Sequence, residues 1–363
     1  MKVLYVSSVN PLVKSGYYNA VADRLNQLRQ DTDLETIAIN YSQHSITELF
    51  NYTIYKPRLM IQRGPLRYLE NFYIYRKLME ILSVTKPDIV HVHWCYPIGY
   101  CTIKACKTLN IPCVLTSHGS DIHSNPLKNN YIYSKSEWAL KNSTFNIFVS
   151  ESLQAQAQEM FGTMSPSLTI PNAVDVHAIL SDLPPKEKRK IKQVLYIGNL
   201  NTTKGADLLP AIFAEINKHY PKDEVCFLIA GHGPLYNQIN TRIFELKINA
   251  KLLGHLPRSE SIKLINLSDL VIIPSRHEGF GIVALEAFIT NTPCVGFNIP
   301  GLKNIFRSNE NLLAEFLSIP DIASKSISVL KNNEEIDFSR YASEYDISNT
   351  IKQEKNLYLK LTI

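Results

Sequence analysis

Glu278 and Glu286 stand eight residues apart on either side of a Gly-Phe-Gly turn, in the sequence VIIPSRHEGFGIVALEAFIT. Glu286 lies inside IVALEAFI, a run that is apolar on every side and therefore typical of a helix packed in a protein interior. A buried carboxylate without a partner is strongly destabilising, so a purely structural Glu286 would need an Arg or Lys nearby. Because ionised carboxylates accept strong hydrogen bonds from hydroxyl groups, a sugar is the alternative partner.

The turn between the two glutamates is a candidate phosphate site. LVIIPS reads as a buried strand and GFGIVALEAFITN as the start of a helix, so the glycines form the strand-to-helix turn. Glycines let the backbone approach a ligand closely, and N–H groups at a helix start bind anions. Helical side chains lean toward the N-terminus, so Glu286, about one turn or ~5.4 Å into the helix, would point back toward this site. Two carboxylates beside a phosphate cradle would hold the hydroxyl groups at both ends of a nucleotide sugar.

The elements that must position these residues are short β-branched strands alternating with helices, a pattern that predicts parallel sheets covered on both faces. The proline-containing, charged segment 182–193 is typical of a linker. We therefore predict an α/β protein with two doubly wound, Rossmann-like domains, 1–180 and 181–340, that face a deep cleft. An amphipathic helix within 341–363 should pack back on the first domain. The predicted strands are KVLYVSSV, LETIAIN, DIVHVHW, PCVLTSH, FNIFVS and LTIPN, then VLYIGNL, VCFLIAG, KLLGHL, LVIIPS and PCVGF.

The composition is that of a globular protein: 363 residues, 45% hydrophobic and 20% charged, with a net charge of +5 that gives little support to nucleic-acid binding. The apolar run of the first residues stops at Val6, too short for a signal peptide, and no later run reaches the ~20 apolar residues of a membrane span. These features predict a cytoplasmic location. The six cysteines show no C-x-x-C pair and are interpreted as reduced core residues.

Residues 55–80 combine six basic side chains with five aromatic ones. Such a mixture suits the interface of an anionic bilayer, which would place the protein at the inner face of the membrane. A solvated helix face over an aromatic core explains the same pattern equally well, so both interpretations stay open.

RHEGFGIVALEA resembles the Glu, seven residues, Glu motif of the retaining glycosyltransferases of family 4, which have the GT-B fold. The resemblance extends over nearly the whole chain and is carried by six segments in the family's order. Besides the first motif these are VLYIGNLNTTKGADLL, LIAGHGPL, KLLGHLP, TIPNAVD, and KPDIVHVHW with TSHGSDI. It implies two domains, the first binding the acceptor and the second the nucleotide sugar.

Carried over by position, the resemblance implies roles for single residues. Lys204 would neutralise the diphosphate, Glu278 would touch the donor sugar and Glu286 would hold the ribose. His118, at the end of a strand, would reach across the cleft to the donor sugar, and Gly16 would lie in the glycine loop at the sugar and phosphates. Catalytic roles fall to Glu278, His118 and Lys204. The other donor-site positions are Asn199, Leu253 beside the base, and the turn residues Gly279, Phe280, Gly281, Ile282 and Val283.

The sequence departs from the family at several of these positions. Asn199 stands where the family usually has an arginine facing the diphosphate, a contact worth ~1–3 kcal/mol. Either Arg276 or another residue substitutes for it, or donor binding is weaker. Ser15, Ala173 and the segment Pro300–Asn304 also differ from the family pattern, which affects donor identity more than the fold.

No metal site or cofactor is predicted. Asp31-Thr32-Asp33 spells the D-x-D motif of the other glycosyltransferase fold, but it precedes a strand instead of following one and is interpreted as a surface loop. His91 and His93 alternate along a strand and lack metal-ligand spacing.

We therefore predict a metal-independent, retaining hexosyltransferase. It would move a sugar from a UDP- or GDP-sugar to the hydroxyl of a glycan or lipid-linked glycan, in bacterial cell-surface polysaccharide synthesis. A GT-B nucleotide-sugar epimerase would use the same cleft without an acceptor, but should lack the paired E-G-F-G and K-G motifs. A non-catalytic partner subunit is suggested by Asn199, while the retention of Lys204, Glu278 and Glu286 argues against it.

Overall fold

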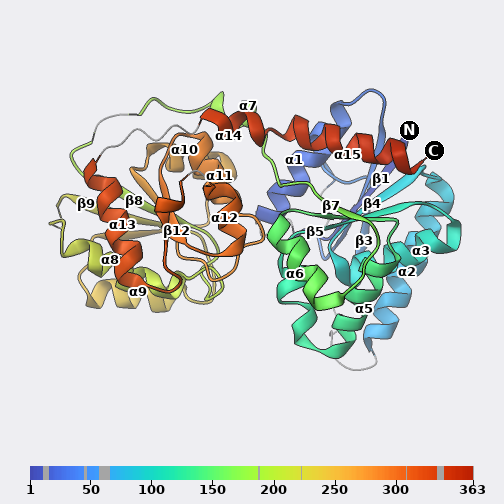
Figure 1. Ribbon diagram of the computed structural model, residues 1–363, viewed down its shortest axis with the longest axis horizontal. Coiled ribbons are helices and arrows are strands. Elements are labelled where there is room, and N and C mark those ends of the chain that lie inside the picture. Colours follow the sequence, from blue (N-terminus) through green and yellow to red (C-terminus); the bar gives the residue numbers. More distant parts are fainter. Residues whose placement is uncertain are drawn as a thin grey trace. The chain divides into compact units, whose positions relative to one another are not determined.

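The chain divides into two compact units, and each is described by itself. The first comprises Met1–Ala173 and Ile347–Ile363, and the second Val174–Asp346 (Figure 1). The predicted linker segment falls within the second unit, where it follows the first helix, and its last two residues, 192 and 193, begin the first strand. The computed structural model describes residues 1–10, 16–44, 47–56, 66–186, 189–221, 223–307, 309–332 and 339–362.

The sheet of the first unit is parallel, with the strand order β3-β2-β1-β4-β5-β6-β7. Six of these strands match predicted ones. β3 was not predicted, because it is a short edge strand with only one fully buried residue, Ile54. The order reverses between β1 and β4, the switch point at which doubly wound sheets bind ligands. The strands are β1 (Lys2–Ser7), β2 (Glu35–Ser42), β3 (Tyr52–Tyr55), β4 (Ile89–His93), β5 (Cys113–Ser117), β6 (Phe145–Phe148) and β7 (Ser167–Thr169).

Helices connect and flank these strands. Ser150 is the N-cap of α6, since its hydroxyl accepts a hydrogen bond from the Leu153 amide at 3.2 Å. The helices of this unit are α1 (Gly16–Gln30), α2 (Leu66–Thr85), α3 (Tyr100–Leu109), α4 (Ser120–His123), α5 (Asn130–Asn142), α6 (Glu151–Phe161) and α15 (Ile347–Leu361), with short turns at η1 (Cys95–Gly99) and η2 (Pro126–Lys128).

α15 belongs to the first unit although it ends the chain, and Figure 1 shows it beside α1. Its apolar residues Ile351, Leu357 and Tyr358 join the core cluster that surrounds β1. A fully buried ion pair reinforces this packing, because Nε of Arg24 in α1 donates to Oε1 of Glu354 at 3.0 Å. The far end of the chain is therefore an integral part of the first unit's core.

The second sheet is also parallel, in the order β10-β9-β8-β11-β12-β13, so its switch point lies between β8 and β11. β13 has two residues and was not predicted. The strands are β8 (Lys192–Ile197), β9 (Val225–Ala230), β10 (Ala250–Gly254), β11 (Leu270–Ile273), β12 (Cys294–Phe297) and β13 (Leu313–Ala314). The helices are α7 (Val176–Leu180), η3 (Ala206–Leu208), α8 (Leu209–Asn217), α9 (Tyr236–Glu245), α10 (Arg258–Leu267), α11 (Ile282–Ile289), α12 (Pro300–Phe306), η4 (Glu310–Leu312), α13 (Ile319–Asn332) and α14 (Ser339–Glu344).

Two parallel α/β units, one with seven strands and one with six, confirm the predicted fold class. Over the stretches that the structure describes, none of the helices combines the length and the apolar character needed to cross a membrane. All six cysteines are free thiols, and five are buried, with Cys226 the partly exposed one.

Candidate active site

The candidate site of the second unit is built on its switch point. Lys204 follows β8 and Glu278 follows β11, the two adjacent strands between which the strand order reverses. Nζ of Lys204 lies 2.7 Å from Oε2 of Glu278, and both side chains are partly exposed, at 32% and 13%. The position predicted to bind ligands in a doubly wound sheet thus holds an ion pair that solvent can reach.

Neighbouring groups fix both members of this pair. The Ser275 hydroxyl donates to Oε1 of Glu278 at 2.8 Å, and the Lys204 amide donates to Oδ1 of Asn201 at 2.9 Å. Gly205 has φ +67°, and a Cβ there would lie 1.7 Å from the carbonyl oxygen of Pro274. Only glycine fits this left-handed position, so the loop after β8 can press directly against the loop after β11.

The predicted turn before α11 is present, and its residues divide into two groups. Gly281 caps the helix with φ +91°, while Ile282 and Val283 form the first turn of α11 and are partly exposed. Amides of a first helical turn have no acceptor within the helix, so they can serve an anion. Phe280 differs, because its ring is 3% exposed and packs edge-on against Tyr345. Phe280 can therefore contribute backbone but not its side chain to a ligand.

Glu286 is buried at 5% exposure, and Nε of Arg258 donates to its Oε1 at 3.1 Å. Arg258 is the first residue of α10, which follows β10. The structure therefore supplies the cation that a structural Glu286 would need. The predicted contact with ribose stays a prediction, and it must be compatible with this ion pair.

The positive charge that Asn199 lacks is not replaced by Arg276 in this structure. Asn199 is exposed after β8, and its carbonyl accepts a hydrogen bond from the Tyr196 hydroxyl at 3.0 Å. Nη1 and Nη2 of Arg276 each donate to a carboxylate oxygen of Asp207 at 2.7 Å. Arg276 would have to give up this bidentate pair to reach a diphosphate. Leu253 lies in β10 and is 37% exposed.

The first unit has its own polar cluster at the carboxyl ends of β4 and β5. His118 follows β5, and its Nε2 lies 2.8 Å from Nδ1 of His93, the last residue of β4. Burial lowers the pKa of both rings well below 6.5, so both are neutral and the N–H of one ring donates a hydrogen bond to the nitrogen of the other. Oδ1 of Asp121 accepts from the main-chain amides of His118 and Gly119, at 2.9 Å each, which fixes the backbone of the predicted catalytic histidine. Gly16 begins α1, and the preceding residues 11–15 lie outside the described part of the chain.

The histidines and aspartates that were considered and rejected as metal ligands contact other protein side chains. Nε2 of His91 lies 2.7 Å from the Thr116 hydroxyl, and its Nδ1 lies 2.5 Å from the hydroxyl of Tyr358 in α15. Asp31 and Asp33 both accept from Nζ of Lys355, at 2.8 and 2.7 Å, so D-x-D anchors the C-terminal helix. Among the described residues, no group of three or more His, Cys, Asp and Glu side chains could hold a metal ion.

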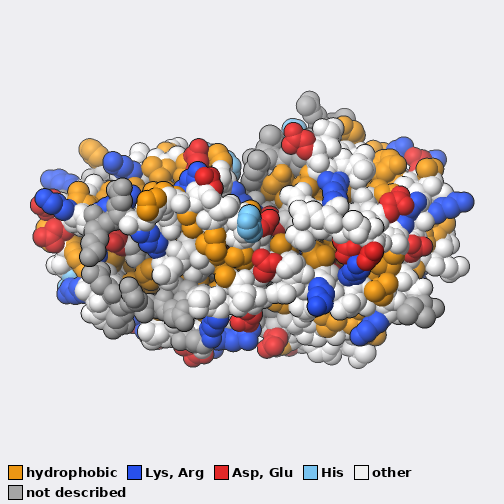
Figure 2. Space-filling view, turned by 90° about the horizontal axis from the view of Figure 1, so that it is seen from above, with side chains coloured by type: hydrophobic (Ala, Val, Ile, Leu, Met, Phe, Trp, Pro, Cys, Tyr) orange, Lys and Arg blue, Asp and Glu red, His pale blue; other side chains and the backbone are white. Residues whose placement is uncertain are grey.

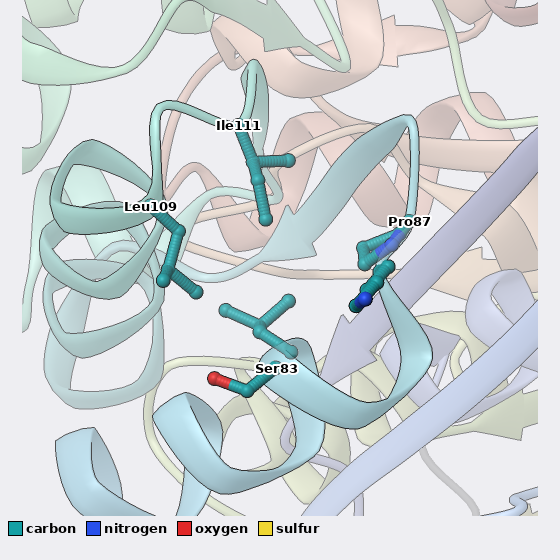
Figure 3. Close-up of a pocket in the computed structure, with 6 residues that line it drawn as sticks. Ser83, Pro87, Leu109 and Ile111 are labelled. Atoms are coloured by element: carbon teal, nitrogen blue, oxygen red, sulfur yellow. The ribbon is translucent and has the colours of Figure 1, made fainter.

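A surface hollow of about 410 Å³ lies elsewhere in the first unit (Figure 3). Ser83 comes from the end of α2, Pro87 precedes β4, and Leu109 and Ile111 lie at the end of α3 and before β5. These positions lie at the amino ends of the strands, whereas His118 lies at a carboxyl end. The hollow is therefore separate from the histidine cluster of the first unit.

Four residues that support the predicted site residues, two in each unit, were not predicted. Arg258 and His93 belong to other elements than their partners, and no spacing in the sequence relates them to Glu286 and His118. Ser275 and Asp121 lie three residues from the residues they hold, so a local search for hydrogen-bonding side chains could have found them.

Both halves of the chain match known family models. Residues 25–178 match the model described as Glycosyltransferase Family 4, and residues 182–345 match Glycosyl transferases group 1. An uncharacterized glycosyltransferase of Methanocaldococcus jannaschii is 28% identical over 339 residues, which cover 92% of this chain and 90% of the relative. The UDP-Gal:alpha-D-GlcNAc-diphosphoundecaprenol alpha-1,3-galactosyltransferase of Escherichia coli is 29% identical over 252 residues, 64% of this chain and 63% of that enzyme.

The fold also matches solved structures. Anabaena HepE, crystallised in complex with UDP and glucose, superposes with a TM-score of 0.77 over 99% of this chain and 100% of HepE, at 15% identity. At that identity the match concerns the fold, which is the two-domain GT-B arrangement of parallel α/β sheets.

Proposed function

The chain belongs to glycosyltransferase family 4, and from this premise we propose that it transfers a sugar from a nucleotide diphosphate sugar to an acceptor hydroxyl with retention of anomeric configuration. The observation that carries the proposal is the Lys204–Glu278 ion pair at the switch point of the second sheet, beside the start of α11. This arrangement sets one cation and a set of helix-start amides where a diphosphate would bind. UDP is the preferred donor nucleotide, because HepE was solved with UDP and the Escherichia coli relative is named for a UDP-sugar.

In the proposed reaction the bond between the anomeric carbon and the diphosphate oxygen breaks, and the acceptor oxygen bonds to that carbon on the same face. The acceptor's proton passes to the departing phosphate oxygen. Lys204 leaves Glu278 for the diphosphate, where it stabilises the charge that develops as the bond breaks. Glu278, still held by Ser275, then accepts hydrogen bonds from hydroxyl groups of the donor sugar.

The remaining assignments follow the family. The Gly281, Ile282 and Val283 backbone binds phosphate, Glu286 binds the ribose and Leu253 borders the base, while His118 contacts the donor sugar. The acceptor is proposed to be a lipid-linked glycan, as the name of the Escherichia coli relative suggests, and the protein would meet it at the inner face of the membrane. The reaction is proposed to need no metal ion.

The test is release of nucleotide from a panel of UDP-, GDP- and ADP-sugars by the purified full chain, with and without acceptor and with a chelator. A transferase should release the nucleotide slowly when no acceptor is present and faster when acceptor is added. Addition of the chelator should leave both rates unchanged. Release of a free sugar with altered stereochemistry, unaffected by acceptor, would instead identify an epimerase. A folded protein that turns over no donor would be a non-catalytic partner, the alternative that Asn199 suggests.

A further inference from the structure

Helices α2, α3 and α5 of the first unit share a surface on which aromatic rings and cations alternate. Nζ of Lys135 lies 4.8 Å from the centre of the Tyr100 ring and 5.4 Å from that of Tyr131. The guanidinium of Arg67 lies 5.0 Å from the centre of the same Tyr131 ring. Tyr68 meets Tyr131 edge to face, with ring centres 5.1 Å apart. These contacts join α2 to α5 through a chain of cation–π and ring contacts.

The chain of contacts continues onto α3. Nζ of Lys104 lies 5.4 Å from the centre of the Tyr75 ring, and Nζ of Lys107 lies 5.9 Å from that of Trp138. The Trp138 ring in turn meets Tyr100, with centres 5.1 Å apart. α2, α3 and α5, which lie together in Figure 1, therefore present one continuous set of rings and cations. We call the surface defined by six of these side chains the aromatic–basic surface. They are Tyr68, Phe72, Tyr100, Lys104, Lys107 and Lys135.

Part of this surface is unusually exposed for apolar side chains. Tyr68, Leu69 and Phe72 of α2 are 61%, 56% and 60% exposed. Single exposed apolar residues are normal in globular proteins, but three large ones within five positions, bordered by cations, mark an interaction site. Core packing does not require them, because α2 already buries Ile74, Leu78 and Leu82. This finding weighs against the solvated-face interpretation of the 55–80 segment.

The charge of the same helices is strongly positive. Residues 66–85, 100–109 and 130–142 carry seven Lys and Arg but three Glu, a net charge of +4, compared with +5 for the entire chain. Glu70 is buried at 1% exposure and bonded to Tyr41, so it adds little negative charge to the surface. On the face shown in Figure 2, by contrast, acidic and basic side chains are interspersed. The excess positive charge of the protein is thus concentrated on these three helices.

We propose that the aromatic–basic surface docks on an anionic phospholipid bilayer. Aromatic rings sit favourably at the level of the headgroups, and lysine side chains extend past them to the phosphates. Each basic side chain near an anionic membrane strengthens binding several-fold. A neutral bilayer or an uncharged glycan would not provide this electrostatic attraction. Membrane docking rests on the proposed function only for its biological role. That role would be to bring the first unit to a lipid-linked acceptor.

The test is co-sedimentation of the full chain with vesicles of phosphatidylcholine alone or of phosphatidylcholine mixed with phosphatidylglycerol. We expect binding to the mixed vesicles only, and weaker binding as salt is raised. The variant Lys104→Ser/Lys107→Ser/Lys135→Ser should bind them on the order of 100-fold more weakly. Phe72→Ser should weaken binding in a way that salt does not change, because it removes an apolar contact and no charge.

The matched control is Lys218→Ser/Lys251→Ser/Lys331→Ser, which removes three exposed lysines from the second unit and should bind as the unaltered protein does. Absence of binding to mixed vesicles, equal binding to neutral ones, or equal loss in both triple variants would overturn the proposal. Capture by an acidic polysaccharide without vesicle binding would overturn it as well. Donor hydrolysis, which needs no membrane, reports separately on the proposed function and should be the same in both triple variants.

Discussion

Nζ of Lys204 and Oε2 of Glu278 lie 2.7 Å apart where the strand order of the second sheet reverses. The pair joins a loop after β8 to a loop after β11, as does the ion pair of Arg276 with Asp207. Since Arg276 is held by two hydrogen bonds to Asp207, Lys204 is the cation better placed to exchange its partner for a ligand phosphate.

Lys204→Ala should lower kcat/KM for donor turnover by about 10²–10³-fold, because it removes the charge that stabilises the leaving diphosphate. Stability should change by less than ~1 kcal/mol, since the pair is partly exposed. Steady-state nucleotide release and urea denaturation provide the two measurements. Lys218→Ala, which breaks an exposed lysine–glutamate pair of the same unit, is the control and should leave both unchanged. An unaltered kcat/KM in Lys204→Ala would remove this residue from the reaction.

Arg258→Met should reduce the free energy of unfolding by ~3 kcal/mol, because it takes the cation away from the buried carboxylate of Glu286. Adding Glu286→Gln to that variant should restore most of the stability, as urea denaturation would show. If Glu286 also binds ribose, the stable double variant should bind UDP at least about tenfold more weakly in a calorimetric titration, owing to the lost charged acceptor. Stable protein with unaltered UDP affinity would instead assign Glu286 to structure alone.

The buried histidines predict how stability depends on pH. Burial lowers the pKa of His93 and His118 well below 6.5 and that of His91 to about 3, so the folded state keeps neutral rings that the unfolded chain would protonate. The unfolded state therefore binds more protons below pH ~6.5, and the free energy of unfolding should fall by up to ~4 kcal/mol per pH unit there, while staying unaffected above pH ~7.5.

Urea denaturation across this range measures the effect. His93→Asn should flatten the slope, because one buried imidazole is gone, whereas replacing the exposed His219 should not. A slope that is the same in His93→Asn and the unaltered protein would contradict neutral burial of His93. Donor turnover should show no loss near pH ~6.5 from His118, since its ring stays neutral in the folded protein.

Arg24→Met should destabilise the first unit by ~3–5 kcal/mol, because Glu354 would remain fully buried without its cation. The double variant Arg24→Met/Glu354→Met should recover much of that loss, since an apolar pair suits the site. Arg29→Met is the control, because its guanidinium binds main-chain carbonyls at a more exposed position. Equal stability of Arg24→Met and Arg29→Met in urea would show that α15 is not held by this ion pair.

Strand and helix types could be predicted wherever apolar runs were long and bounded by turn residues, as for β4, β5 and β11. β3 and β13 escaped prediction because edge strands of four and two residues bury too little to leave a pattern. The turn before α11 was predicted correctly because glycine spacing and a helix start are local features. The burial of the Phe280 side chain could not be predicted, since it depends on Tyr345, which lies far away in the sequence.

Ion pairs between residues that only the tertiary structure brings together could not be predicted from sequence patterns. Arg258 and Glu286 are 28 residues apart, and Arg24 and Glu354 are 330 apart. No periodicity connects such positions, because their contact depends on sheet order and on where α15 packs. The resemblance to a family supplied Lys204 and Glu278 by position, but not their ion pair, which family motifs do not encode.

The most direct test of glycosyl transfer at this site is a time course by proton NMR of the purified full chain with an α-linked UDP-sugar and a lipid-linked glycan acceptor. The account predicts UDP release matched by an α-linked product, with both lost in Lys204→Ala. A β-linked product, or product formation that survives the loss of Lys204, would contradict it.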